Sequence, residues 1–289
     1  MSPLVVAGDV SLFCEENGSG DDVVLFIAGR GGQLTDWHND FIALFVAEGF
    51  RVIRFDNRDA GLSTHLDGVT PAPLADISSG AASPPYSLDD MADDAAALLR
   101  ALDISRATVV GHSLGAMIAQ CLAIRQPDLV RALVLVAGTT GESGVGLPSE
   151  AVSRQMASSS LSFGIEEDPL ESAVRSSSQW TSWDLGVTES ELRERLRTRL
   201  DRSHDRAGAA RQVAAVVGAP DRTAALQQLS LPVTIVHGRE DPLVGFDGGE
   251  ALAKAIPGAT FIAIDGLRHD VPRAIWPVLI DAVLRARHA

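Results

Sequence analysis

The amino-acid sequence predicts an α/β protein, with a mostly parallel eight-stranded sheet and helices on both faces. Eight short runs of β-branched and apolar residues recur, and most are continuous, which is typical of parallel strands buried on both faces. Helical patterns separate the later runs, as right-handed crossovers require. The 289 residues, 46% of them hydrophobic, suffice for a large core and exclude wholesale disorder. The predicted strands are Val5–Ala7, Val10–Cys14, Val23–Ala28, Arg51–Phe55, Thr108–Gly111, Leu133–Ala137, Val233–His237 and Thr260–Ile264.

A short link joins the first two runs, so we expect them to begin the sheet as an antiparallel pair. The predicted helix Thr35–Glu48 starts with a candidate N-cap residue and carries one apolar stripe. Ser87 to Asp90 resembles a capping box ahead of the next helix. The helix Ser113–Arg125 is apolar nearly all round, so we expect it to be buried. The remaining predictions are helices over Phe246–Ala255 and Pro272–Arg287 and a long surface loop over Pro71–Pro85.

The interval from residue 141 to residue 221 breaks the alternation of strand and helix. It is rich in Ser and Arg and predicts several helices. The clearest of them opens with a capping box over Thr188–Glu191 and places Glu191 and Arg195 at i,i+4. Such a long helical stretch between two strands predicts an insertion over one edge of the sheet. We therefore expect residues 1–140 and 222–289 to form an α/β core and residues 141–221 to form a helical cap.

The charge balance excludes several classes of partner. Twenty-four Lys and Arg against 38 Asp and Glu give a formal net charge of −14. This field repels a phosphate backbone and an anionic membrane surface, so we expect no nucleic-acid and no membrane partner. Cys14 and Cys121 are too few for a disulfide framework and lack metal-site spacing. Without a basic leader or a long apolar run, we expect a cytoplasmic protein. The sequence indicates no oligomeric state.

The strongest chemical signal is Gly111-His112-Ser113-Leu114-Gly115, which follows an apolar strand and opens an apolar helix. This is the context of a nucleophile elbow. The positions two before and two after the serine must be small there, because strand and helix nearly touch. Ser113 is therefore the candidate nucleophile, held at the apex of a strained turn. His112 occupies the variable position, and we expect it to point away from the serine and pack beneath it.

A serine nucleophile needs a base, and the base needs an orienting carboxylate. Asp241 and His269 each follow a predicted strand, at the edge where open α/β sheets place their sites. Rival carboxylates for the Asp241 role are Glu240, Asp265 and Glu142. We expect the other histidines to have structural and not catalytic roles. His237 ends a strand and should form a hydrogen bond in the core, while His38, His65 and His204 are predicted to lie on the surface of helices or loops.

An oxyanion requires two N–H donors. The first should be the backbone amide of Leu114, at the start of the helix that follows the serine. The second should come from the glycine-rich loop after Val23–Ala28. We assign it to the amide of Arg30, with Gly31 as the rival.

With these motifs in place, the sequence resembles the α/β-hydrolase superfamily over essentially its whole length. The order Ser113, Asp241, His269 is that of the family. The turn from Asp56 to Ser63 matches the family's Asp-x-Arg-Gly-x-Gly-x-Ser motif, with Asp59 in place of the usual glycine. That variant, together with the segment Pro85–Asp94, resembles the branch containing aclacinomycin methylesterase and related serine esterases. The resemblance implies that Asp56 and Arg58 satisfy backbone groups near the site.

A departure from the family pattern lies in the oxyanion loop. Ala28 replaces the histidine that most members carry, and methylesterase relatives lack that histidine too. The sequence does not show which residues brace this loop in place of the histidine.

The resemblance implies a serine esterase acting on a small-molecule ester-like substrate, with no metal and no organic cofactor. Alternatives on the same triad are a lactonase, a C–C bond hydrolase of ring-cleavage products and a cofactor-free perhydrolase. A non-catalytic ligand receptor of the same fold is the alternative from another class. Apolar cap side chains are candidates for lining the pocket or for packing the cap itself, namely Met156, Phe163, Trp180 and Trp183.

Overall fold

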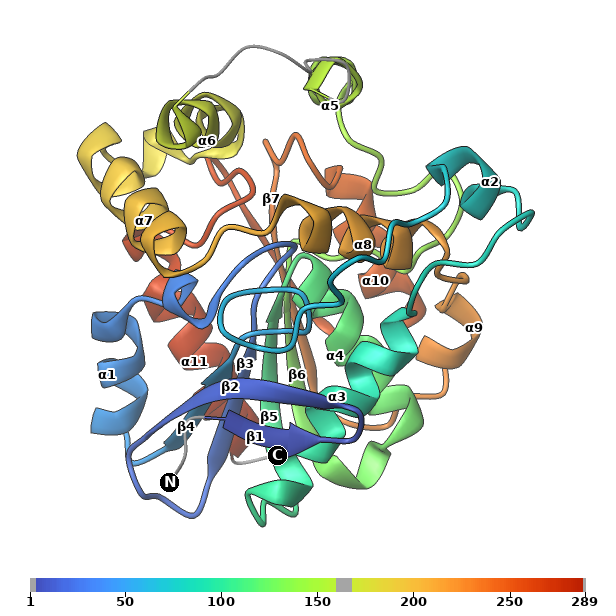
Figure 1. Ribbon diagram of the computed structural model, residues 1–289. Coiled ribbons are helices and arrows are strands. Elements are labelled where there is room, and N and C mark those ends of the chain that lie inside the picture. Colours follow the sequence, from blue (N-terminus) through green and yellow to red (C-terminus); the bar gives the residue numbers. More distant parts are fainter. Residues whose placement is uncertain (1–3, 160–167, 288–289) are drawn as a thin grey trace.

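A computed structural model describes residues 4–159 and 168–287 of the chain (Figure 1). Its centre is an eight-stranded sheet in the order β1-β2-β4-β3-β5-β6-β7-β8. The strands are β1 (Leu4–Ala7), β2 (Val10–Asn17), β3 (Val23–Ile27), β4 (Arg51–Phe55), β5 (Ala107–His112), β6 (Val130–Val136), β7 (Val233–Gly238) and β8 (Thr260–Ile264). All eight predicted runs fall on these strands, within a few residues at each end.

The strand directions fit the prediction of a mostly parallel sheet. β1 pairs with β2 and β2 with β4 in antiparallel fashion, and every other neighbouring pair is parallel. The chain passes from β3 to β4 on one side and then to β5 on the other, so the strand order reverses between β3 and β5. A crevice forms at such a switch point, beyond the carboxyl ends of the strands.

Helices cover both faces of the sheet, as the alternation of the sequence predicts. One face packs against α1 (Asn39–Ala47) and α11 (Trp276–Arg287). The other packs against α3 (Leu88–Ala101), α4 (Leu114–Arg125) and α10 (Phe246–Ala255). The smaller elements are α2 (Leu74–Ser78), α9 (Thr223–Leu226) and the 3-10 turns Leu34–Asp36, Pro127–Leu129, Ser178–Trp180, Trp183–Leu185 and Arg273–Ile275.

The core explains the apolar runs. All five residues of β3 are buried, because both faces of this central strand lie under helices. α4 is buried along its length, from Leu114 to Ala123, between the sheet and its neighbouring helices, as its apolar surface predicts. Each fully buried aliphatic or aromatic side chain stabilises the fold by about 1.5–3 kcal/mol relative to exposure. The site-bearing loops thus project from a rigid support.

Four helices between β6 and β7 lie above the carboxyl edge of the sheet (Figure 1). They are α5 (Glu150–Ser159), α6 (Pro169–Ser177), α7 (Glu189–Arg202) and α8 (Arg206–Val217). Two of these helices, α6 and α7, share a small apolar cluster of Val174, Leu192 and Leu196. Phe163 and the side chain of Met156 lie outside the described residues.

Several local predictions need correction. The helix expected over 35–48 begins only at Asn39, capped by His38, because a separate 3-10 turn precedes it. The helix expected from Pro272 starts at Trp276, again after a 3-10 turn. The loop over 71–85 contains the short helix α2. The capping boxes are confirmed, both before α3 and before α7.

The ion pair expected on α7 is also wrong. Glu191 accepts hydrogen bonds from the backbone and hydroxyl of Thr188, and this capping geometry holds its carboxylate at the end of the helix. The i,i+4 pair on α7 instead joins Glu189 and Arg193, at 2.8 Å.

Candidate active site

Ser113 stands at a sharp turn between β5 and α4. Its backbone has φ 55° and ψ −117°, a conformation that costs a non-glycine residue about 1–3 kcal/mol. A Cβ on Gly111 would lie 2.3 Å from the carbonyl oxygen of Gly115, and one on Gly115 would lie 2.1 Å from that of Ile27. Both glycines are therefore required by contact between the strand and the helix, as the motif predicts.

Asp241 and His269, predicted from the sequence, lie beside this serine. Nε2 of His269 is 2.8 Å from Oγ of Ser113, and Nδ1 is 2.7 Å from Oδ2 of Asp241. The other oxygen of Asp241 accepts the amides of Leu243 and Val244, each at 2.9 Å. Since Asp241 and His269 are only 7% and 5% exposed, water competes little for these hydrogen bonds.

The rival carboxylates have other partners. Glu240 accepts the amide of Gly266 at 2.7 Å, and Asp265 is 89% exposed and pairs with Arg239. Glu142 is exposed. Within the described part of the chain, the imidazole of His269 forms its carboxylate hydrogen bond with Asp241.

Two further histidines lie near the triad. Nε2 of His237 is 2.9 Å from the carbonyl oxygen of Val244, so the expected hydrogen bond in the core is confirmed. The ring of His112 packs against that of His269, with ring centroids 5.0 Å apart. Burial, and next the charge of His269, lower the pKa of His112 to about 3. His112 therefore stays neutral and adds no positive charge beside His269.

The loop between β3 and the following 3-10 turn passes close to the serine. A Cβ on Gly29 would lie 3.4 Å from that of Ser113, so the loop backbone borders the candidate nucleophile. The amide of Gly31 donates to Oε1 of Gln212 at 2.6 Å. No hydrogen bond among the described residues uses the amide of Arg30 or of Leu114. The rival donor is thus already engaged, while the two amides assigned from the sequence are free.

Two amide side chains brace this loop where the family histidine is replaced by Ala28. Asn57 donates to the carbonyl oxygen of Ala28 at 3.1 Å. Gln212, on α8 and fully buried, donates to the carbonyl oxygen of Arg58 at 2.9 Å while it accepts from Gly31. Sequence reasoning did not find Gln212, because nothing in a helical run of Ala, Arg and Val shows what lies across the fold.

The segment between β6 and β7 also contacts the loop that bears His269. The amide of His269 donates to the carbonyl oxygen of Trp180 at 3.1 Å. Ser182 donates its amide and its hydroxyl to the buried carboxylate of Asp270. Trp183 is 37% exposed, and its indole N–H donates to the carbonyl oxygen of Ser178. Trp183 therefore contacts its own segment and solvent, in keeping with the packing alternative.

The turn from Asp56 to Ser63 behaves as the resemblance implies for Asp56 but not for Arg58. Asp56 accepts the amides of Leu34 and Leu62. Arg58 instead forms two 2.6 Å hydrogen bonds with the carboxylate of Asp94 on α3. A buried carboxylate takes a guanidinium in preference to weaker backbone partners, because two charged groups compensate each other's desolvation.

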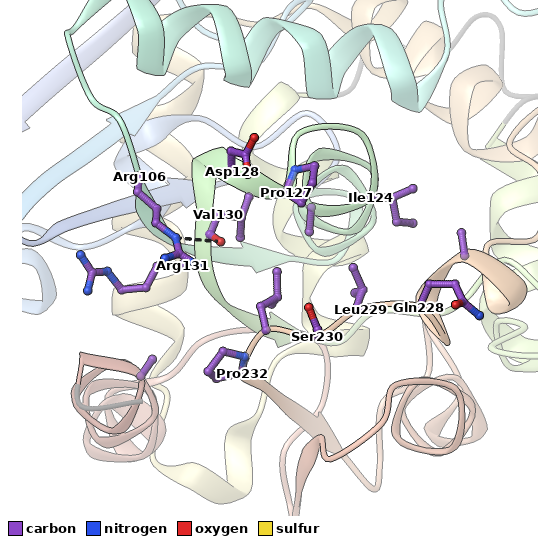
Figure 2. Close-up of a pocket in the computed structure, with 14 residues that line it drawn as sticks. Arg106, Ile124, Pro127, Asp128, Val130, Arg131, Gln228, Leu229, Ser230 and Pro232 are labelled. Carbon is purple, nitrogen blue, oxygen red and sulfur yellow. Dashed lines mark hydrogen bonds between the residues drawn. The ribbon is translucent and has the colours of Figure 1, made fainter.

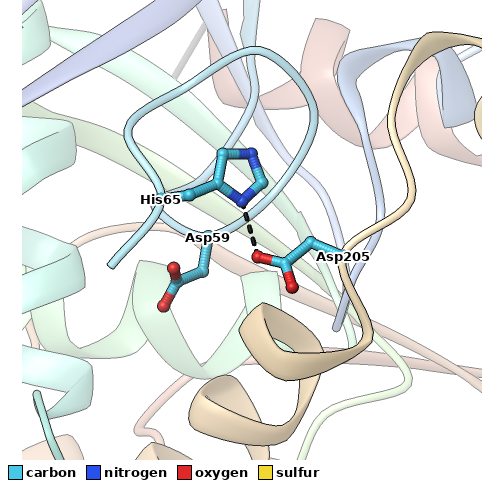
Figure 3. A group of neighbouring side chains, drawn as sticks. All are labelled: Asp59, His65 and Asp205. Atoms are coloured by element: carbon cyan, nitrogen blue, oxygen red, sulfur yellow. Dashed lines mark hydrogen bonds and ion pairs between the residues drawn. The ribbon is translucent and has the colours of Figure 1, made fainter. Parts of the chain in front are cut away.

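Asp59, the departure from the family turn, has φ 65° and is fully buried. Its two oxygens accept from the guanidinium of Arg211 on α8 at 2.7 and 2.8 Å. His65 and Asp205 lie next to it, close enough for the three side chains to resemble a metal site (Figure 3). Arg211 already supplies a cation to both carboxylates, so we assign no metal here.

A separate cavity has a volume of about 770 Å³, and Figure 2 shows the residues that line it. It is lined by the amino end of β6 and by the segments that precede β5, β6 and β7, including Arg106, Val130 and Pro232. The triad lies at the opposite, carboxyl edge of the sheet, so this cavity is not part of the candidate active site.

The turn at Ser113, the adjoining histidine and the switch-point topology agree with a comparison of the sequence against family models. Residues 22–272 match the model of the alpha/beta hydrolase fold. The chain belongs to the α/β-hydrolase family. No described helix has both the length and the apolar character needed to cross a membrane.

Individual relatives refine this placement. The rhodomycin D methylesterase DauP of Streptomyces sp. strain C5 is 29% identical over 97% of this chain and 96% of its own. BpoC of Mycobacterium tuberculosis is 41% identical over 128 residues, and the match spans 44% of this chain and 42% of BpoC. A hydrolase of Pseudomonas aeruginosa superimposes with a TM-score of 0.76 at 26% identity, over 100% of this chain and 99% of that one. Together with the family match, the full-length similarity to DauP confirms the resemblance to the methylesterase branch of this fold.

Proposed function

We propose that this protein is a serine hydrolase that cleaves a small-molecule carboxylic ester through an acyl-enzyme intermediate. The observation that supports it is the continuous hydrogen-bonded chain from Ser113 through His269 to Asp241, at 2.8 and 2.7 Å. These contacts have the length that proton transfer from a hydroxyl to an imidazole requires.

In the proposed reaction, His269 takes the proton of Ser113 as the hydroxyl oxygen attacks the ester carbonyl carbon. Asp241 holds the imidazole in the required tautomer and stabilises the imidazolium that forms. The amides of Leu114 and Arg30 donate to the tetrahedral oxyanion. His269 then gives its proton to the leaving alcohol, and the same imidazole activates the water that releases the acid.

Each oxyanion donor of this kind contributes on the order of 10²–10³ in rate. Arg30 is favoured over Gly31 because the Gly31 amide is already bonded to Gln212. Leu114 is favoured because it is the first residue of α4, where an amide has no partner within the helix.

Residues 141–221 are proposed to act as a cap over the catalytic edge. This segment contacts the active-site loops at two places. Trp180 and Ser182 bond the loop that bears His269, and Gln212 of α8 bonds the loop that contains Gly31. The full-length similarity to a methylesterase supports an ester as the substrate class.

A fluorophosphonate probe tests the proposal. We expect it to label Ser113, and Ser113→Ala to abolish both labelling and turnover of p-nitrophenyl butyrate. Full turnover by the alanine variant would contradict the mechanism. Labelling of an enzyme that hydrolyses no ester in a broad panel would instead favour the receptor alternative.

A further inference from the structure

A second, smaller cavity lies between the oxyanion loop and the cap. Its volume is about 160 Å³, enough for one carboxylate or phosphate group. The turn between α7 and α8 forms one wall, and two core loops form the other. The principal lining residues are Arg30 and Gly61 from the core and Arg199, His204, Asp205 and Arg206 from the cap.

Positive charge gathers at this cavity. Three of the lining side chains are arginines, in a chain where acidic residues outnumber basic ones by 38 to 24. Neither Arg30 nor Arg206 forms an ion pair with any described residue, and Arg199 reaches Asp36 only at 3.5 Å. Partial burial, followed by the charges of Arg206 and Arg199, lowers the pKa of His204, as expected in positive surroundings.

The two acidic residues at the cavity do not neutralise these arginines. Asp59 is bonded through both oxygens to Arg211. Asp205 bonds His65 at 2.6 Å and the amide of Gly208 at 2.8 Å, and Figure 3 shows its carboxylate directed toward His65. Their charge is taken up within that network, so Arg30 and Arg206 have no ion-pair partner among the described residues and Arg199 has only the 3.5 Å contact with Asp36.

The cavity adjoins the candidate catalytic site. Arg30 supplies a wall of the cavity with its side chain and the proposed oxyanion donor with its amide. A Cβ on Gly31 would lie 3.7 Å from Nη2 of Arg199, so that guanidinium rests against the oxyanion loop. A molecule whose carbonyl is bound at Ser113 therefore has a cationic cavity beside it.

We propose that this cavity is an anion-binding subsite for a carboxylate- or phosphate-sized group. The group belongs either to an acidic ester whose carbonyl lies at Ser113, which rests on the proposed function, or to a free inorganic anion. Arginine suits both, because its planar donors match the oxygens of carboxylate and phosphate.

The first experiment measures binding without catalysis. Inorganic phosphate is titrated into the Ser113→Ala protein by calorimetry in a non-phosphate buffer. We expect saturable binding that weakens about tenfold in Arg199→Gln and in Arg206→Gln, since each loses a charge-assisted hydrogen bond. Arg285→Gln, which removes an exposed arginine on α11, should leave the affinity unchanged.

The second experiment identifies the source of the anion. The p-nitrophenyl monoester of succinic acid is compared with neutral p-nitrophenyl butyrate, which has the same acyl length. For an acidic substrate, Arg206→Gln should raise KM about tenfold for the succinate ester and leave the butyrate kinetics unchanged.

The outcomes separate the two sources. Phosphate binding with no preference for the acidic ester assigns the subsite to a free anion, and the reverse pattern assigns it to the substrate. The proposal is overturned if both tests are negative, or if the arginine variants behave as Arg285→Gln does. If the proposed serine mechanism is wrong and neither ester is hydrolysed, the phosphate titration still tests the subsite, because it measures binding and not turnover.

Discussion

Replacement of Gln212 by methionine tests whether α8 holds in place the loop that carries the proposed oxyanion donor Arg30. Methionine matches glutamine in length and volume but offers no amide. The variant removes the acceptor of the Gly31 amide, at 2.6 Å, and the donor to the Arg58 carbonyl, at 2.9 Å. Both backbone groups would then be left without a partner at a position where Gln212 is fully buried.

The size of the effect follows from those two contacts. Each unsatisfied buried group costs about 1–3 kcal/mol, so a rigid loop would lose about 2–6 kcal/mol. A loop shift that lets the Gly31 amide reach another acceptor costs less, and it moves the neighbouring Arg30 amide. Complete loss of one oxyanion donor lowers kcat by about 10²–10³. We therefore expect a fall of about 10- to 100-fold in kcat, with a smaller change in KM.

The assay is steady-state hydrolysis of p-nitrophenyl butyrate, together with the rate of fluorophosphonate labelling and thermal unfolding. Gln120→Met is the matched control. Gln120 is also fully buried and bonds the Thr139 carbonyl and Arg222, away from the oxyanion loop. It should lower stability comparably while kcat stays near the wild-type value. Gln212→Glu keeps an acceptor for Gly31 and should recover part of kcat. A folded Gln212→Met protein with wild-type kcat and labelling rate would show that Gln212 does not position the Arg30 amide.

Substitutions at the Asp241, Arg211 and His112 positions have distinct expected effects on activity and stability. Asp241→Asn should lower kcat on the order of 10⁴-fold, because the imidazole loses its tautomer-fixing acceptor, whereas Glu240→Gln should remain within a few-fold; equal activities would contradict the assignment. Arg211→Met should lower the free energy of unfolding, measured in urea, by about 3–5 kcal/mol, because it leaves Asp59 buried and unpaired. The double variant Arg211→Met/Asp59→Gly should regain most of that stability, and no gain would contradict the importance of the pair. Because the pKa of His112 is low in the folded state, the unfolded chain binds more protons below pH 6.5. Between pH 6.5 and pH 4 the free energy of unfolding should therefore fall more steeply in the wild type than in His112→Gln, by up to about 1.4 kcal/mol per pH unit. Parallel curves of unfolding free energy against pH would exclude this cause.

Local pattern was enough to predict the strands and most of the helices. A fully buried parallel strand such as β3 needs a continuous apolar run, and a capping box such as that at Ser87 is complete within four residues. The predicted start of a helix was wrong where a 3-10 turn precedes the helix, as before Asn39. The same side chains are compatible with both conformations, so the sequence pattern does not separate them.

The turn at Ser113 was predictable for the same reason. The chemistry of a nucleophile elbow dictates small residues at fixed offsets, and the chain order of its partners narrows the choice of acid and base. The sequence already favoured Asp241 over Glu240 and Arg30 over Gly31, but only the fold supplied the contacts that distinguish these neighbours. Neighbouring residues in a loop differ in where they point, and short-range pattern does not record that direction.

The linear chain thus contains the fold class, the elbow and the candidates for acid, base and oxyanion donors, because each depends on residues close together in sequence. The tertiary structure alone joins Gln212 to Gly31, Arg211 to Asp59 and Ser182 to Asp270. Each of these contacts spans 88 residues or more. Partners at such separations are set by how residues 141–221 pack on the rest of the fold, and no periodicity along the chain specifies them.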